Sequence, residues 1–236
     1  MTVSTSKEPA RIAGMFDAIA RRYDTLNHVL SAGLDRRWRR RAIRELRLTG
    51  SERLIDVCTG TADLALAAAR GGAREVVGVD FAGAMLGLGL AKVRRAALSV
   101  PVHLVRGDAT QLPVAGGSCQ AATVAFGIRN VVDVPAACGE LARVLGPGGR
   151  LAILELAVPR APIVGALYRS YSRHILPRIG RLVSRHGQAY AYLPASVAEF
   201  PSGEAFAGVL RQAGFSSVRC VSLTMGAVYL YVAVRD

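Results

Sequence analysis

Lysine and acidic residues are scarce in this chain. Only Lys7 and Lys92 are lysine among its 30 basic residues, and 17 acidic residues leave a formal net charge of +13. A basic excess of this size indicates an anionic partner, either a nucleic acid or a membrane surface. The bias toward arginine carries less weight, because a GC-rich genome produces it without selection for binding.

Cysteine is also rare, and no hydrophobic run is long. The 4 cysteines lie far apart, with no Cys-x-x-Cys pair and no histidine at metal-ligand spacing, so we expect free thiols and no metal site. The longest apolar stretch, residues 81–91, is well short of the roughly 18 residues that a membrane span needs. The polar first ten residues contain no signal-peptide core, and we therefore expect a cytoplasmic protein.

The overall composition is that of an ordinary globular chain. Hydrophobic residues make up 51% and charged residues 20%, which excludes disordered, collagen-like and coiled-coil proteins. A chain of 236 residues can bury roughly 70% of its unfolded surface, so it needs no disulfide or metal for stability. We expect a single domain that spans residues 1–236.

Short apolar runs alternate with helical stretches from residue 54 onward. This alternation is typical of βαβ units and a parallel sheet. The expected strands are residues 54–58, 75–80, 102–108, 120–126, 150–157, 216–223 and 227–234. Helices are expected up to Arg70 and Ala97, from Val134 to Leu145 and from Ser202 to Ala213, with GPGG as the break before the fifth strand. The predicted fold class is therefore α/β, with a doubly wound, mostly parallel seven-stranded sheet.

Two segments stand outside this alternation. Residues 1–50 carry helical periodicity from Met15 to Leu30 and predict an N-terminal helical lid. Residues 162–199 contain three prolines among aromatic and basic residues. There we expect a helical insertion that binds substrate, because insertions at such positions carry function.

Seven arginines crowd the expected second helix around Trp38, between Arg36 and Arg47. Two interpretations are open. In the first, the helix packs on the sheet through Trp38, Ile43 and Leu46 and turns a solvated basic face outward. In the second, the arginines bind an anionic surface, which predicts peripheral contact with the inner face of a membrane.

Residues 55–66 have the form of a cofactor-binding loop. A strand ends in a turn at Gly60, and a helix is expected to start near Thr61, whose hydroxyl would cap the exposed amides. The dinucleotide pattern G-x-G-x-x-G is absent, because Gly60 is the only glycine here, and this disfavours a bound pyrophosphate. A phosphate-free ligand that bears a carboxylate fits better.

Acidic residues follow the next two strands. Asp80 ends the second strand, where a carboxylate accepts hydrogen bonds from both ribose hydroxyls, although a cap for the helix near Gly83 is an alternative. After the third strand, Asp108 can accept from an adenine amino group while the amide of Ala109 donates to a ring nitrogen. Together with Gly60, these positions predict an adenosine across the carboxyl edge of the sheet.

Five segments carry a family resemblance: MFDAIARRYDTLNHVLS from Met15, AFGIRNV from Ala125, RVLGPGGRLAILE from Arg143, HILPRIG from His174 and AYAYLPASVAEFP from Ala189. On these motifs the chain resembles the ubiquinone/menaquinone biosynthesis C-methyltransferases, a family of class I S-adenosylmethionine-dependent methyltransferases, over nearly its whole length. The resemblance implies a Rossmann-like methyltransferase domain, S-adenosylmethionine as cofactor and a prenylated quinol as substrate, with demethylmenaquinol first among the candidates. It assigns cofactor binding to Thr61, Asp80, Asp108 and Ala109.

The implied reaction also points to catalytic residues. The enzyme must hold an activated methyl group in line with a nucleophilic ring carbon and exclude water. Arg129 is the candidate that stabilises the phenolate, lowering the pKa of the quinol hydroxyl while a water takes the proton. Asn130 would orient that water or the second quinol oxygen, and a capping role for both residues in the turn before Asp133 is the alternative.

Three further residues complete the candidate site. His174 and Tyr190 lie in the expected insertion, with His174 as a proton acceptor, although a lone histidine in an apolar run is more often packed than catalytic. Tyr23 lies one helical turn from Asn27 and could face the methionine part of the cofactor or belong to the core.

Other functions are compatible with the sequence. Methyltransferases that act on another small molecule or on nucleic acid share the cofactor motifs, but the chain has no stacking platform of aromatic and basic residues, so we expect no nucleic-acid partner. A non-catalytic nucleoside-binding protein would keep Asp80 without needing the FGIRN motif. The choice between a benzoquinol and a naphthoquinol, the prenyl length and the oligomeric state stay open.

Overall fold

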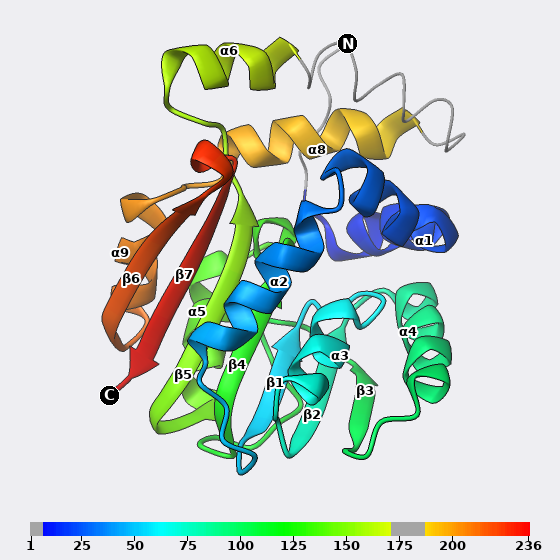
Figure 1. Cartoon of the computed structure of the whole chain (residues 1–236), viewed down its shortest axis with the longest axis vertical. Coiled ribbons are helices and arrows are strands. Elements are labelled where there is room, and N and C mark those ends of the chain that lie inside the picture. The colour runs from blue at the N-terminus through cyan, green and yellow to red at the C-terminus, as the bar shows by residue number, and fades with distance from the viewer. Residues whose placement is uncertain (1–6, 171–186) are drawn as a thin grey trace.

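A seven-stranded sheet forms the centre of the protein, in the order β3-β2-β1-β4-β5-β7-β6. The structure, a computed structural model, describes residues 7–170 and 187–236 (Figure 1). The strands are β1 (Arg53–Val57), β2 (Glu75–Asp80), β3 (Val102–Arg106), β4 (Cys119–Ala125), β5 (Leu145–Leu156), β6 (Phe215–Leu223) and β7 (Val228–Arg235). Neighbours among β1 to β5 are parallel, and β7 lies antiparallel between β5 and β6. The predicted doubly wound, mostly parallel sheet is confirmed.

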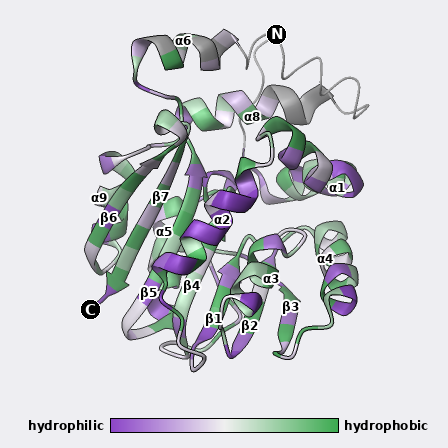
Figure 2. Ribbon diagram, viewed as in Figure 1, coloured by the Kyte–Doolittle hydropathy of each residue, from purple (hydrophilic) through white to green (hydrophobic). Residues whose placement is uncertain are grey.

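Helices cover the sheet on both faces. They are α1 (Pro9–Leu30), α2 (Leu34–Glu45), α3 (Asp63–Arg70), α4 (Gly83–Ala96), α5 (Val134–Val144), α6 (Pro162–Ser170), α8 (Gly187–Glu199) and α9 (Glu204–Gln212), with short 3-10 turns η1 (Ile128–Asn130) and η3 (Thr224–Gly226). One face packs against α2 and α3, and the other against α5 and α9 (Figure 1). Hydrophobic residues follow the strands, whereas α2 carries a strongly hydrophilic surface (Figure 2).

Burial on both faces explains the continuous apolar runs of the parallel strands. Ile55 and Val57 of β1 are almost fully buried. The polar residue between them, Asp56, is buried as well and accepts hydrogen bonds from the hydroxyls of Thr59 (2.6 Å) and Thr123 (2.7 Å). Burial raises the pKa of Asp56 to about 6.

One predicted strand boundary is wrong. β5 begins at Leu145, not at residue 150, because the GPGG segment does not break the strand. It forms an irregularity in the pairing with β4, with Gly148 at a φ of 71°, and the regular register resumes where Arg150 pairs with Ala121. The expected insertion is helical at both of its described ends, as α6 and α8, and residues 171–186 lie outside the described residues.

The N-terminal helix α1 packs beside α4 rather than on a face of the sheet. Phe16, Ala20 and Tyr23 of α1 contact Ala82 and Met85 at the start of α4. The helical periodicity seen in the sequence is therefore real, and its apolar stripe faces the carboxyl edge of the sheet, where the strand ends that carry Asp80 and Asp108 also lie.

Candidate functional site

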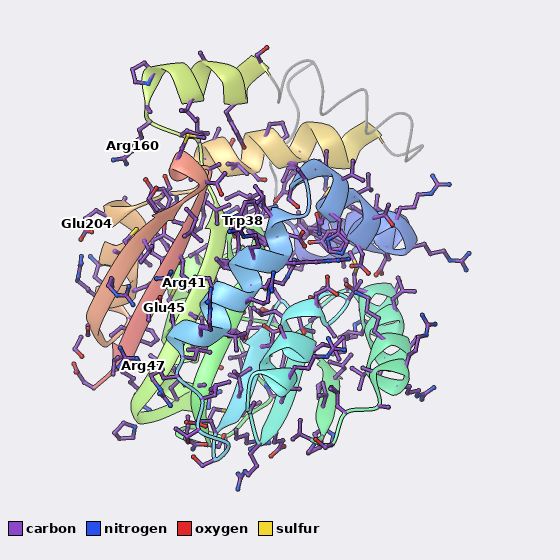
Figure 3. The ribbon with its side chains drawn as sticks, viewed as in Figure 1. Trp38, Arg41, Glu45, Arg47, Arg160 and Glu204 are labelled. Carbon is purple, nitrogen blue, oxygen red and sulfur yellow. The ribbon has the colours of Figure 1, made fainter. Side chains whose placement is uncertain are left out.

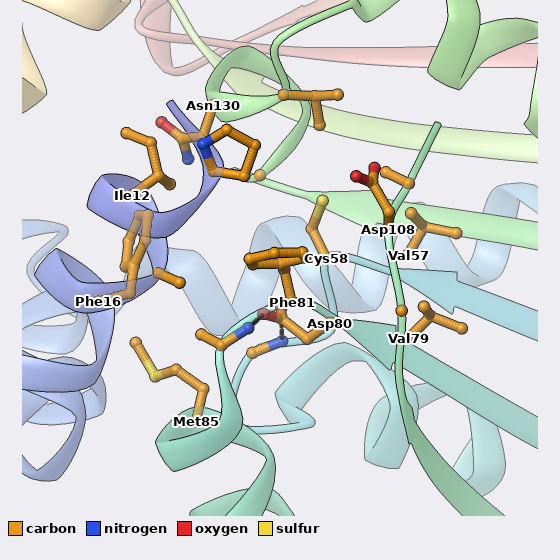
Figure 4. Close-up of a pocket in the computed structure, with 18 of the residues that line it drawn as sticks. Ile12, Phe16, Val57, Cys58, Val79, Asp80, Phe81, Met85, Asp108 and Asn130 are labelled. Atoms are coloured by element: carbon orange, nitrogen blue, oxygen red, sulfur yellow. Dashed lines mark hydrogen bonds between the residues drawn. The ribbon is translucent and has the colours of Figure 1, made fainter. Parts of the chain in front are cut away.

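The carboxyl ends of β1, β2 and β4 and the facing side of α1 enclose a cavity of about 270 Å³, which we call the first cavity (Figure 4). Asp80 and Asp108 reach it from the strand ends, and Ile12 and Phe16 reach it from α1. Four more of the predicted site residues line it: Tyr23, Gly60, Ala109 and Asn130. Segments far apart in the sequence therefore meet where an adenosine was expected.

Asp80 organises the floor of the first cavity. Its two carboxylate oxygens accept hydrogen bonds from the amides of Gly60 and Ala82, each at 2.8 Å (Figure 4). Burial raises the pKa of Asp80, and these amide donors oppose that shift. Each carboxylate oxygen has a further lone pair, so the carboxylate retains acceptor capacity toward the cavity while it ties the loop after β1 to the start of α4.

Asp108 and its neighbours form the other polar wall. Asp108 Oδ1 accepts hydrogen bonds from the amide and the hydroxyl of Thr110, both at 2.8 Å. Within the described parts of the chain, nothing donates to Asp108 Oδ2 and nothing accepts from the amide of Ala109. The acceptor and donor that the sequence assigned to an adenine edge are thus available in the structure.

Phe81 is a cavity residue that the sequence analysis missed. It follows Asp80 directly, is 38% exposed and lines the first cavity. The guanidinium carbon of Arg106 lies 5.7 Å from the centre of its ring. An exposed aromatic side chain directly after the acidic residue was the available signal, because a purine ring stacks readily on such a surface.

Thr61 does not cap α3, and that prediction is wrong. The N-cap position is Ala62, in the left-handed region at φ 67°, with no side-chain cap. The turn directs the Thr61 hydroxyl toward α1, where it donates to Asp24 Oδ1 (2.5 Å) and accepts from Lys92 Nζ (2.9 Å). Thr61 is also absent from the lining of the first cavity, so its assignment to the cofactor stays a prediction.

Lys92 of α4 joins three elements, a contact that no pattern in the sequence indicates. Its ammonium group lies 2.6 Å from Asp24 of α1 and 2.6 Å from Asp63 of α3, in addition to its bond with Thr61. We call these four residues the Lys92 latch. A second contact supports it, since Asp17 of α1 accepts the amide of Ala84 in the first turn of α4 (2.9 Å). Together they hold α1 over the first cavity.

A second cavity of about 170 Å³ adjoins the first, between α1, α2 and α8. Phe16, Tyr23 and Phe126 line both cavities and form the shared wall. Most of the second cavity's lining is apolar, and its polar members include Asn27, Arg129 and the ion pair of Asp35 with Arg39. Burial raises the pKa of Tyr23, and a hydrogen bond with the Asn27 side chain opposes the rise.

The turn η1 directs neighbouring side chains into different cavities. Arg129 lines the second cavity and Asn130 the first. The tight approach of β4 to β1 requires Gly127 at the start of this turn, because a Cβ there would lie 2.3 Å from Cβ of Cys58. The glycine of the FGIRN motif therefore sets the position of the two polar residues that follow.

Arg129 is buried and held by three acceptors. It forms an ion pair with Glu155 (2.7 Å), donates to the carbonyl of Phe126 and places Nε 3.4 Å from Ser196 Oγ. Burial lowers the pKa of Arg129, but the Glu155 carboxylate outweighs burial and leaves it raised. An acidic residue inside the apolar strand ILEL was the signal for Glu155, since a buried carboxylate requires a cation.

Asn130 accepts a hydrogen bond from the hydroxyl of Tyr192 in α8 (3.1 Å). The residues of this insertion that the sequence predicts for the site are His174 and Tyr190. His174 lies outside the described residues, and so does the side chain of Tyr190, so both assignments stay predictions.

Ligand-type atoms of His28, Asp35 and Asp63 also come close together. The geometry is explained without a metal ion, because Arg39 pairs with Asp35 and Lys92 pairs with Asp63. His28 lies 2.9 Å from the same Asp35 carboxylate.

Solved structures share this fold. The [4+2]-cyclase SpnF superposes with a TM-score of 0.69 at 18% identity, covering 95% of each chain. A Thermotoga maritima S-adenosylmethionine-dependent methyltransferase, titled a possible histamine N-methyltransferase, gives 0.65 at 19% identity over 94% of this chain and 99% of its own. These likenesses show that the chain has the Rossmann-like fold of this class of proteins. SpnF shows that this fold also hosts other chemistry, so fold alone does not give the activity.

Sequence comparison supplies the family. The model of the ubiE/COQ5 methyltransferase family matches residues 2–235, and the chain belongs to that family. The ubiquinone/menaquinone biosynthesis C-methyltransferase UbiE of Syntrophotalea carbinolica is 49% identical over 94% of this chain and 93% of its own. The demethylmenaquinone methyltransferase of Thermus thermophilus is 45% identical over 94% of this chain and 100% of its own. The family resemblance seen in the sequence motifs is confirmed.

Proposed function

We propose that this methyltransferase transfers the methyl group of S-adenosylmethionine to a ring carbon of a prenylated quinol, with demethylmenaquinol as the substrate. The observation that carries the proposal is the pair of adjoining cavities, one polar at its strand-end wall and the other largely apolar, with the Arg129–Asn130 turn between them. The substrate class comes from the relatives, whose names specify ubiquinone/menaquinone biosynthesis and demethylmenaquinone.

The first cavity fits an adenosine-bearing cofactor. Asp80 and Asp108 offer carboxylate acceptors for hydroxyl and amino groups, and Ala109 offers an amide donor. A wall with two carboxylates favours a ligand that presents hydroxyl and amino donors to it. When bound, S-adenosylmethionine supplies an electrophilic methyl group on a sulfonium, so no further activation of the donor is needed.

The second cavity fits the quinol ring, and Arg129 is the cationic group that we assign to it, because the other arginine of the lining, Arg39, is paired with Asp35. Although Glu155 and Phe126 occupy Nη1 and Ser196 lies near Nε, no described residue accepts from Nη2 of Arg129. That nitrogen can donate to a quinol oxygen, lower its pKa and favour the phenolate, while a water takes the proton. The shared wall of Phe16, Tyr23 and Phe126 excludes bulk water from the reacting atoms.

A methyl-transfer assay tests the proposal. Purified protein is given S-adenosylmethionine with a labelled methyl group and one of three acceptors: a short-chain demethylmenaquinol, the corresponding demethylated benzoquinol, or bulk RNA. We expect label in the naphthoquinol. Label in RNA, or no label in either quinol while S-adenosylhomocysteine still binds, contradicts the proposal and favours another acceptor.

Contact with an anionic membrane surface is the second part of the proposal, together with a cytoplasmic location. Ile43 and Leu46 bury α2 against the sheet, and Trp38 donates to Thr224 Oγ1 (3.0 Å), so the helix has a packed side. Its other side carries exposed arginines (Figure 3), of which only Arg41 has a described carboxylate partner on the same helix. No described helix is both long and apolar enough to cross a bilayer.

Vesicle sedimentation tests this contact. Arginines near anionic headgroups contribute about 1 kcal/mol each, so a few of them suffice for reversible binding that salt weakens. The test variant replaces four α2 arginines by glutamine: Arg36, Arg37, Arg40 and Arg44. A control of equal charge replaces four exposed arginines elsewhere: Arg70, Arg74, Arg94 and Arg95. We expect the control to sediment with phosphatidylglycerol vesicles and the α2 variant to stay in solution. Equal sedimentation of the two variants contradicts a role for α2.

A further inference from the structure

Tyr192 of α8 links the two cavities, and the proposed chemistry does not use it. The residue is 3% exposed and lines the second cavity. Its hydroxyl donates to Oδ1 of Asn130 over 3.1 Å, and Asn130 lines the first cavity. A single hydrogen bond therefore joins a residue that lines the second cavity to a residue that lines the first.

This bond decides which end of the Asn130 carboxamide faces the first cavity. The amide has one acceptor oxygen and one donor nitrogen. Oδ1 accepts from the Tyr192 hydroxyl and is thereby held toward α8, so Nδ2 is the end of the amide for which the structure describes no partner. Asn130 is 9% exposed, and it faces the first cavity (Figure 4). Without the hydroxyl, either end of the amide can turn toward the ligand.

We propose that Tyr192 is a positioning residue that holds the Asn130 carboxamide with its nitrogen donating into the first cavity, and so raises the affinity for the cofactor. The inference rests on the proposed function only in that S-adenosylmethionine binds in the first cavity. Tyr192 acts through Asn130 and does not itself line that cavity.

The surroundings of the bond favour this role. Burial raises the pKa of Tyr192, so its hydroxyl keeps its proton and remains a donor at neutral and moderately basic pH. The same helix places Ser196 beside Arg129, one turn further along. Leu193 and Pro194 between them line the second cavity. A quinol packed against α8 would therefore press on the helix that orients the donor in the first cavity.

Calorimetric titration with S-adenosylhomocysteine tests the inference, with Tyr192→Phe as the variant. The ring and its packing are kept, and only the hydroxyl is lost. We expect the dissociation constant to rise about three- to tenfold, the effect of one neutral hydrogen bond. Tyr231→Phe is the matched control, because Tyr231 is 1% exposed and its hydroxyl accepts from the amide of Gly203 (2.8 Å), away from both cavities. The control should lower the melting temperature and leave the dissociation constant unchanged.

A double-mutant cycle separates positioning from general stability. In the Asn130→Ala background, Tyr192→Phe should have no further effect on affinity, because the side chain it orients is gone. Asn130→Asp keeps an acceptor for Tyr192 but removes the donor, and should weaken binding even in a folded protein with intact Tyr192. Additive effects, or an Asn130→Asp variant that binds like wild type, overturn the inference.

These measurements do not depend on the quinol. If wild type binds S-adenosylhomocysteine but methylates neither quinol, the proposed substrate is wrong and the role of Tyr192 is still decided by the cycle. If wild type does not bind S-adenosylhomocysteine, the cofactor assignment and the positioning role of Tyr192 are both wrong.

Discussion

Replacing Asp80 by alanine separates the two tasks of that carboxylate, holding the loop and binding the cofactor. Asp80 accepts from the amides of Gly60 and Ala82 at 2.8 Å each. Hydrogen bonds to a charged group contribute roughly 1.5–3 kcal/mol each, so losing both costs about 3–6 kcal/mol before any compensation. Removing a carboxylate whose pKa is raised by burial recovers part of this, and water in the cavity can reach the freed amides. We expect a net loss of about 2–4 kcal/mol in the free energy of unfolding.

Asp80→Ala should also lower the affinity for the cofactor. The two ribose hydroxyls lose a shared charged acceptor, and affinity for S-adenosylhomocysteine should fall by a factor of about a hundred, or roughly 3 kcal/mol. Calorimetry measures the affinity, and urea denaturation measures the stability. Asp133→Ala serves as the control, because Asp133 caps α5 through the amide of Ala136 (2.9 Å) and lies outside both cavities. That variant should lose about 1 kcal/mol of stability and no affinity.

Two outcomes would refute this reasoning about Asp80. An affinity for S-adenosylhomocysteine within threefold of wild type would contradict the assignment of the adenosine to the first cavity. A variant with wild-type stability would show that the two amides need no carboxylate.

The remaining predictions concern charge. Burial raises the pKa of Asp56 to about 6, against about 3.9 in an unfolded chain. The contribution of this carboxyl group to the free energy of unfolding is therefore fully present below pH 4 and is lost as the pH rises through 6. Relative to wild type, Asp56→Asn should therefore gain up to about 3 kcal/mol between pH 4 and 7 in urea denaturation, and parallel pH curves would contradict this. Lys92→Met removes the ion pair with Asp24, so the variant should release S-adenosylhomocysteine a few times faster than wild type in stopped-flow measurements. Salt should accelerate release from wild type but not from the variant. Equal rates and equal salt dependence would mean that the Lys92 latch does not hold α1. Arg129→Lys should lower kcat, with partial recovery at higher pH and unchanged cofactor affinity, whereas an equal loss of cofactor binding would assign Arg129 a structural role.

The parts of the site that follow strand ends were predictable from the sequence. Asp80 and Asp108 come directly after apolar runs, and in a parallel sheet such positions converge on one edge. The mostly parallel, doubly wound sheet followed from the alternation of apolar runs and helical stretches, whereas the order of its strands comes from the structure. GPGG misled the strand boundary because glycine and proline usually end a strand, whereas here they form an irregular pairing inside one.

Contacts between distant segments were not predictable. Lys92 meets Asp24 and Asp63, which lie 68 and 29 positions away, and nothing in the local pattern of α4 indicates either partner. The hydrogen bond between Tyr192 and Asn130 was equally out of reach of the sequence, because only the docking of α8 on η1 brings these two residues together.

The scarcity of lysine gives the Lys92 latch a use as a chemical reporter. Amine-selective acylating reagents do not modify arginine, so Lys7 and Lys92 are the only side chains of this chain that they label. The Lys92 nitrogen is engaged by oxygens of Asp24, Asp63 and Thr61, and a reagent must compete with all of them. Labelling at Lys92, measured by mass spectrometry against the same residue in the urea-unfolded chain, therefore reads out how often α1 leaves the first cavity, with no substrate, cofactor or engineered probe present.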